Sequence, residues 1–140
     1  MYSASLVARY IVNYCNSNGK TISNLRLQKT LYFVQAEFLV SKGTPCFNDE
    51  IYAWDLGPVV PEVYREYKIF GSSAIPSIRY FGKKISEEDQ EMINNIVDEC
   101  NKHSSYALVQ MTHEQAPWIK AYNSFSNGII TKASIREYFS

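Results

Sequence analysis

Histidine and cysteine are the residue types in this chain that could carry nucleophilic catalysis. The sequence contains His103 and His113, and its three cysteines are Cys15, Cys46 and Cys100. A thiol acts as a nucleophile when a base lies within hydrogen-bond reach, so His113 with a thiol or a carboxylate defines a candidate small hydrolase or transferase. There is no glycine-flanked serine elbow, and spacing alone does not pair His113 with any thiol. This enzymatic alternative stays open, and no catalytic residue is assigned.

The same residues do not form a metal-binding pattern. The two histidines are ten positions apart in different predicted helices, and His113-Glu114 lacks the second histidine of the metalloprotease motif. The cysteines show no CxxC spacing, and a zinc site needs three or four protein ligands. The glycines are scattered singly, without a Walker loop or a dinucleotide fingerprint. The sequence therefore predicts no metal site and no cofactor.

Two glutamines and two tryptophans are candidates for a structural or binding role. Gln28 and Gln35 lie seven positions apart on one side of a predicted helix, and they either pair with the backbone of a neighbouring loop or line a groove. The first interpretation is favoured because buried polar groups usually pair with others. Trp54 and Trp118 are expected to be core residues that hold loops through the indole N–H.

His113 has a structural interpretation beside the catalytic one. Thr112 and Gln115 have the spacing of a capping box, which would place His113 at the start of a helix. Contact with a protein partner is the second alternative for this side chain. The eleven tyrosines favour a partner as well, since tyrosine is enriched at protein interfaces.

Apolar periodicity, caps and turn residues predict which elements position these side chains. The chain is expected to be mainly α (α+β), with six to seven helices and a small two-stranded β element. Ser23, Ser86 and Thr131 are predicted helix caps, and Pro61 is expected at a first helical position. A strand is expected at Ile51–Trp54, and it is expected to form a two-stranded hairpin with a short strand over Ile78–Phe81. The helix after Ser23 is apolar on more than one face, which predicts a central helix rather than a DNA-reading one.

Composition limits the class of protein. The 140 residues are expected to form one domain over 1–140. Basic and acidic residues number 14 each, and this zero net charge argues against non-specific nucleic-acid binding. The sequence shows no signal peptide and no membrane-spanning stretch, so a cytoplasmic protein with reduced thiols is expected. The oligomeric state is left open.

Three sequence blocks together resemble a known family. They are Leu27-Gln28-Lys29 continuing into Leu31-Tyr32-Phe33, then Ala53-Trp54 with Gly57-Pro58-Val59, and finally Thr112-His113 with Pro117-Trp118. In this order they resemble the Panacea domain of SocA-like antitoxins, also called phage-associated GepA-like proteins. The likeness covers nearly the whole chain.

The resemblance implies a non-enzymatic domain that neutralises a toxin by direct binding. The implied partner is a protein toxin encoded nearby, in a toxin–antitoxin system of phage or prophage origin, and a ClpXP-type protease is a further candidate partner if the domain acts as a proteolytic adaptor. The expected partner-binding residues surround the central helix, the turn after Trp54 and the segment at His113. They are Gln28, Lys29, Tyr32, Gln35, Trp54, Gly57, Pro58, His113 and Trp118. Replacing Tyr32 or His113 with alanine is expected to weaken binding and spare stability.

Overall fold

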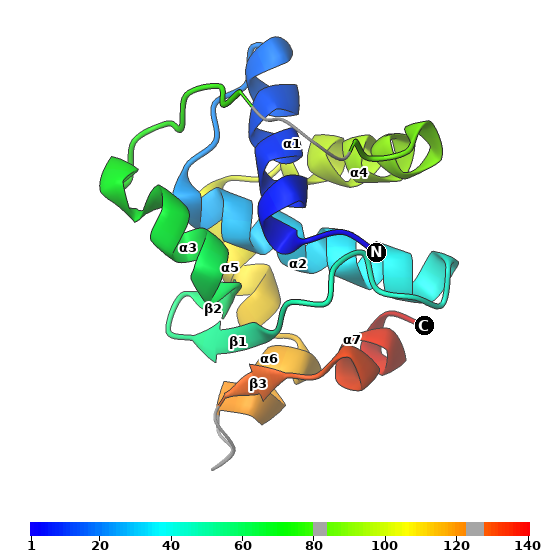
Figure 1. Ribbon diagram of the computed structural model, residues 1–140. Helices are drawn as coiled ribbons and strands as arrows, with labels where there is room; N and C mark the ends of the chain where they lie inside the picture. The colour runs from blue at the N-terminus through cyan, green and yellow to red at the C-terminus, as the bar shows by residue number, and fades with distance from the viewer. Residues whose placement is uncertain (80–83, 123–127) are drawn as a thin grey trace.

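A computed structural model describes residues 1–79, 84–122 and 128–140, and its fold is mainly α with a small sheet, as predicted (Figure 1). The elements in chain order are α1 (Ala4–Ser17), α2 (Asn24–Ser41), β1 (Ile51–Trp54), β2 (Gly57–Val59), α3 (Pro61–Tyr67), the 3-10 helix η1 (Lys68–Phe70), α4 (Glu87–Cys100), α5 (Ser105–His113), α6 (Ala116–Tyr122), β3 (Ile129–Ile130) and α7 (Lys132–Phe139).

Side-chain caps fix where most of these helices begin. Ser23, Ser86 and Thr131 each accept a hydrogen bond from the backbone N–H three residues later, which confirms the predicted caps of α2, α4 and α7. Ser104 caps α5 in the same way. Pro61 opens α3, where a proline costs no hydrogen bond because the N–H of that position has no helical partner.

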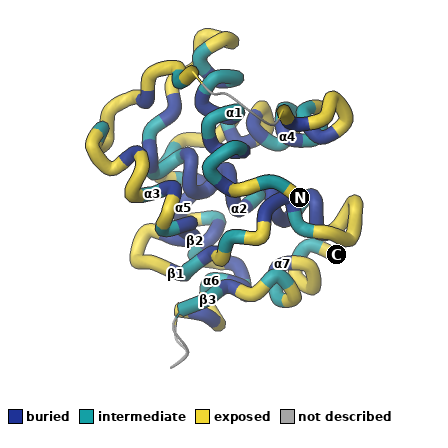
Figure 2. The backbone as a smooth tube through the Cα atoms, in the orientation of Figure 1, coloured by how far each residue is buried: buried dark blue, intermediate teal, exposed yellow. Residues whose placement is uncertain are grey.

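Helix α2 runs through the middle of the molecule (Figure 1). It contacts α1, α4, α5, α7 and strand β2, so neighbours lie on several of its sides. Most of its length is buried, as the dark segment in Figure 2 shows. The broad apolar surface in the sequence had predicted this central position. A polar side chain at one of the buried positions of α2 therefore faces protein, and it must find its hydrogen-bond partners there.

The sheet differs from the predicted hairpin. Its strand order is β2-β1-β3 with antiparallel pairing, and Trp54 pairs with Gly57 across the Asp55-Leu56 turn. The predicted partner over 78–81 was wrong for its described part, because both backbone groups of Ile78 bond to the side chain of Asn13 instead. Residues 80 and 81 lie outside the described residues. β2 escaped prediction because it is short and contains a proline.

The predicted capping box at Thr112 was also wrong. Helix α5 continues through Thr112 to His113, and α6 begins only at Ala116. The Thr112 hydroxyl donates to the Val109 carbonyl 2.9 Å away, within the same helix. His113 therefore ends a helix rather than starting one. The short break between α5 and α6 lets both helices reach the turn between β1 and β2.

Candidate functional site

Three aromatic side chains hold the turn between β1 and β2 from one side. His113 donates from Nε2 to the Asp55 carbonyl at 2.8 Å, a direction fixed because a carbonyl can only accept. The indole N–H of Trp118 donates to the Trp54 carbonyl at 2.9 Å, and the Tyr122 hydroxyl donates to the Asp55 carboxylate. We call His113, Trp118 and Tyr122 the aromatic clamp.

The clamp is also a stack of rings. The ring centroids of His113 and Trp118 are 4.2 Å apart, and those of Trp118 and Tyr122 are 4.5 Å apart and close to parallel. Trp118 and Tyr122 are four residues apart on α6, so they share one face of that helix. Sequence reasoning included His113 and Trp118 but missed Tyr122 and Asp55. The four-residue spacing from Trp118 was the signal that could have pointed to Tyr122.

Lys29 approaches the same turn from helix α2. It has no solvent exposure, and its ammonium donates to the Pro58 carbonyl at 3.0 Å. No carboxylate among the described residues forms an ion pair with it. Because burial disfavours the charged amine, the pKa of Lys29 falls from 10.5 to about 7. A buried lysine without an acidic partner is uncommon, and it marks this place in the fold.

Gln28 completes the support of strand β2. Its side-chain oxygen accepts from the Val60 N–H at 2.9 Å, and its amide donates to Asn24. Gln28 and Lys29 thus satisfy the backbone groups of β2 and the next residue that point away from β1. The Gln28 result confirms the interpretation that this side chain pairs with a neighbouring backbone.

Gln35 plays the same role two helical turns later. Its side-chain oxygen accepts from the Cys46 and Phe47 N–H groups, and its amide donates to the Phe47 carbonyl at 2.8 Å. Gln35 therefore fixes the loop that enters β1, which confirms the loop-pairing interpretation for this residue as well.

Tyr32 lies between these two glutamines and is fully buried. Its hydroxyl donates to Gln115 at 2.7 Å, and burial raises the pKa of the phenol. With Gln28, Lys29 and Gln35, Tyr32 forms a buried layer beneath the turn. A role of these four residues in partner binding stays a proposal, and Tyr32 and Gln35 would act in it through the contacts that they hold.

The predicted core position of Trp54 was wrong. The residue is 38% exposed, and its ring packs edge-on against Tyr64 with the centroids 5.2 Å apart. Leu56, at the tip of the turn, is 56% exposed. Trp118 does hold a loop through its indole N–H, as predicted. The turn therefore presents two large apolar side chains to solvent while its backbone is bonded on both sides.

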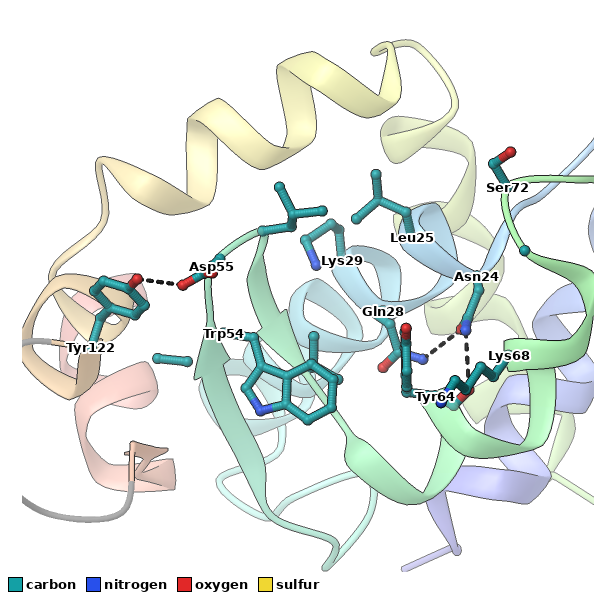
Figure 3. A pocket seen from close by; sticks show the side chains of 14 residues that line it. Asn24, Leu25, Gln28, Lys29, Trp54, Asp55, Tyr64, Lys68, Ser72 and Tyr122 are labelled. Carbon is teal, nitrogen blue, oxygen red and sulfur yellow. Dashed lines mark hydrogen bonds between the residues drawn. The ribbon is translucent and has the colours of Figure 1, made fainter.

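A pocket of about 690 Å³ opens beside the turn (Figure 3). Its walls come from α2, the β1–β2 hairpin, α3, η1 and α6. The lining residues are Asn24, Leu25, Gln28, Lys29, Ala53, Trp54, Asp55, Leu56, Val59, Tyr64, Lys68, Gly71, Ser72 and Tyr122. Most of the lining is apolar, and Lys29 belongs to its buried floor. Pockets of this size and character commonly bind ligands or partner side chains.

The thiols have none of the features of nucleophiles. Burial raises the pKa of Cys46 to about 12 and that of Cys100 to about 11, and the pKa of Cys15 is raised for the same reason. A protonated, buried thiol is inert. Residues 1–79, 84–122 and 128–140 contain no group of three potential metal ligands. In the same part of the chain, no helix has the length and apolar character that crossing a membrane requires.

The model of the family "Antitoxin SocA-like, Panacea domain" matches residues 27–119. The chain belongs to this family. It is also 33% identical over 128 residues to Antitoxin SocA from Caulobacter vibrioides (strain NA1000 / CB15N), an alignment that covers 82% of this chain and 68% of that protein. The comparison with solved structures found no match.

Membership of the SocA-like, Panacea-domain family confirms the resemblance seen in the motifs. It supports an antitoxin role and favours a non-enzymatic protein. The matched range includes Lys29, the turn, His113 and Trp118, whereas Tyr122 lies just beyond it. The candidate site of this Panacea domain therefore lies almost wholly within the family match.

Proposed function

We propose that this chain is an antitoxin that neutralises a protein toxin by binding it directly, with the β1–β2 turn at the centre of the contact. The observation that carries the proposal is the pair of exposed apolar side chains, Trp54 and Leu56, on a turn whose backbone is bonded from both sides. Tyr122 and Ile119 are exposed on α6, a helix that packs against β1. Exposed apolar groups on a rigid support are typical of binding surfaces.

Rigidity matters because ordering a loop during binding costs free energy. The clamp and Lys29 hold the turn before any partner arrives, so little further ordering would be needed. Trp54 is also of the residue type that most often dominates interface energies. In this proposal Trp54, Leu56 and the exposed parts of the clamp contact the toxin. Buried residues of α2, together with Gly57 and Pro58, keep the turn in place.

The test is co-expression with the product of the neighbouring gene, which is the candidate toxin. Cell growth and co-purification are measured for the unchanged protein and for a Leu56→Asp variant. We expect the neighbour to be toxic alone and harmless in a co-purifying complex. Leu56→Asp should restore toxicity and abolish co-purification, because a charge at the tip of the turn would need desolvation in the contact.

A matched control keeps the result specific to the turn. Val40, near the end of α2, is 41% exposed, and in Figure 1 that end of α2 lies on the opposite side of the molecule from the β1–β2 turn. Val40→Asp should leave growth and co-purification unchanged. If Leu56→Asp neutralises the toxin as well as the unchanged protein, the turn is not the contact. If the neighbour is harmless and nothing co-purifies, the antitoxin role itself fails.

The same cultures separate two modes of neutralisation. In plain sequestration, the toxin accumulates with the antitoxin at a constant level. A proteolytic adaptor would instead shorten the lifetime of the toxin in a strain with an intact ClpXP protease. A toxin half-life that is the same with and without this protein excludes the adaptor mode and leaves direct binding.

A further inference from the structure

The ammonium of Lys29 has hydrogen-bonding capacity that the described fold does not use. It carries three N–H donors, and only the contact with the Pro58 carbonyl occupies one of them within residues 1–79, 84–122 and 128–140. A buried ammonium with few partners is costly, so an anion brought beside it would gain a strong, charge-assisted contact. Lys29 lies among the side chains that line the pocket in Figure 3.

The other charges around the pocket leave this excess of positive charge uncompensated. Lys68 adds a second, exposed ammonium from η1. Asp55 is the carboxylate of the lining, and it already accepts a hydrogen bond from the Tyr122 hydroxyl at the turn. The lining therefore contains two lysine amino groups, of which Lys29 is protonated below about pH 7, and one carboxylate that is held by the clamp. Charge complementarity favours an anionic group in the occupant.

The rest of the lining favours an apolar body. Trp54 and Leu56 expose large apolar surfaces on one wall, and Leu25 and Val59 continue the apolar lining toward the floor. Tyr64 supports the Trp54 ring through its edge-on contact. A fully polar anion such as free phosphate would leave the apolar surface of these walls in contact with water. The pocket is suited to an apolar side chain that has a carboxylate close beside it.

We propose that the pocket receives an acidic–apolar segment of the partner protein, with an apolar side chain against Trp54 and Leu56 and a carboxylate directed to Lys29 and Lys68. This inference rests on the proposed function, since it names the chemistry of the toxin segment that the site would recognise. A carboxylate in this position supplies the buried ammonium with the counter-charge that the described fold does not provide.

Two capped dipeptides test the proposal without the toxin. Acetyl-Phe-Glu-amide carries the carboxylate, and acetyl-Phe-Gln-amide replaces it with a neutral group of the same shape. Each is titrated into the ¹⁵N-labelled protein, and amide and indole resonances are followed by NMR. We expect saturable shifts at Trp54 and Tyr64, with the Glu peptide binding about two- to fivefold more tightly, the scale of a partly exposed ion pair.

Lysine variants assign the preference to the pocket. Lys68→Gln should reduce the preference for the Glu peptide, and Lys29→Met should reduce it further. Lys68 is exposed, so its variant keeps the test valid even if Lys29→Met fails to fold. Lys20→Gln removes the same charge at an exposed lysine outside the pocket and should change nothing.

Equal affinities for the two peptides, or shifts centred outside the pocket, overturn the proposal. So does a Glu preference that Lys68→Gln and Lys20→Gln reduce to the same extent, since that result would reflect net charge alone. The peptide experiment and the co-expression experiment have separate readouts. If the protein neutralises the toxin through the turn but binds neither peptide, the proposed function stands. The proposal of an acidic–apolar segment is then refuted.

Discussion

The side chain of Lys29 lies directly against the backbone of Gly57. A Cβ atom built on Gly57 would come within 2.7 Å of Lys29 Cε and 2.8 Å of the Thr112 hydroxyl oxygen, and the φ angle of Gly57 is +109°. Only glycine meets both requirements, the positive φ and the missing Cβ. Helices α2 and α5 therefore reach the turn through the space that this residue leaves empty.

Replacing Gly57 with alanine should lower the free energy of unfolding by about 2 to 4 kcal/mol, the sum of backbone strain and overpacking. Urea denaturation measures the loss. Gly19→Ala is the matched control, because Gly19 has a φ of +70° but nothing within 4 Å of its added Cβ. That control should lose only about 1 kcal/mol. Equal losses would mean that the contact with Lys29 relaxes without cost.

Lys29 should make stability depend on pH. Its folded pKa of about 7 lies below its ordinary value of 10.5, so between these values the unfolded chain holds a proton that the folded chain has released. The unfolded state binds more protons there, and stability due to Lys29 therefore rises with pH from about 7, by up to about 1.4 kcal/mol per pH unit. Below pH 7 both states are protonated and this dependence levels off.

The measurement for Lys29 compares urea denaturation of the unchanged protein and of Lys29→Met at about pH 6.5, 7.5 and 8.5. Methionine matches the length of the lysine stem without titrating, so the difference between the two proteins isolates the amine. The buried cysteines oppose the trend above about pH 9, because their raised pKa values keep them protonated only in the folded state, but they do so in both proteins. Parallel stability profiles would show that the amine remains charged throughout.

The members of the clamp should act together. His113→Ala and Trp118→Phe each remove one hydrogen bond to the turn, and each should cost about 1 kcal/mol of stability. Since both donors hold adjacent carbonyls and their rings are in contact, their effects should differ from additivity by at least about 0.5 kcal/mol. A double-mutant cycle in urea measures this coupling. Strictly additive losses would mean that each donor holds the turn independently.

The catalytic alternative for His113 gives a different result for one variant. His113→Asn would abolish turnover of an enzyme and leave partner binding intact. In the clamp, the shorter asparagine loses the ring stack on Trp118, so partner binding should weaken together with stability. Isothermal titration with the toxin, alongside thermal denaturation, distinguishes the two outcomes.

Tyr32 should affect stability strongly, contrary to the expectation from the sequence. The side chain is fully buried, so Tyr32→Ala should cost about 3 to 5 kcal/mol through the cavity that it leaves. Tyr32→Phe keeps the ring but leaves the Gln115 oxygen without its donor, and should cost about 1 to 3 kcal/mol. Thermal and urea denaturation measure both variants. A phenylalanine variant as stable as the unchanged protein would mean that Gln115 finds another donor.

Local signals made the helices predictable. Ser23, Ser86 and Thr131 act on backbone groups three residues away, so a short stretch of sequence contains the whole interaction. Strand β3 could not be predicted in this way. It is two residues long, and its partner Ile51 lies far away in the sequence. Pairing of that kind depends on where the surrounding helices place the two segments.

The sequence predicted which residues belong to the candidate site better than it predicted how those residues are arranged and buried. The family motifs included Lys29, Trp54 and His113, and the structure brings all three to one turn. The burial of Lys29 could not be predicted, because lysine is ordinarily a surface residue. The residues next to it in the sequence give no sign that it is buried without a carboxylate partner. The exposure of Trp54 was unpredictable for the opposite reason, since a tryptophan in a strand is normally covered.

The way α2 covers strand β2 restricts how any partner can bind. A peptide that extends a sheet needs free backbone N–H and C=O groups along an outer strand. On β2 the Pro58 carbonyl is taken by Lys29, the Val60 N–H just after it is taken by Gln28, and Pro58 has no N–H to offer. A partner therefore cannot add a strand at this edge. Recognition there has to come from side-chain shape and charge, which leaves the backbone of the partner free to be helical, extended or irregular.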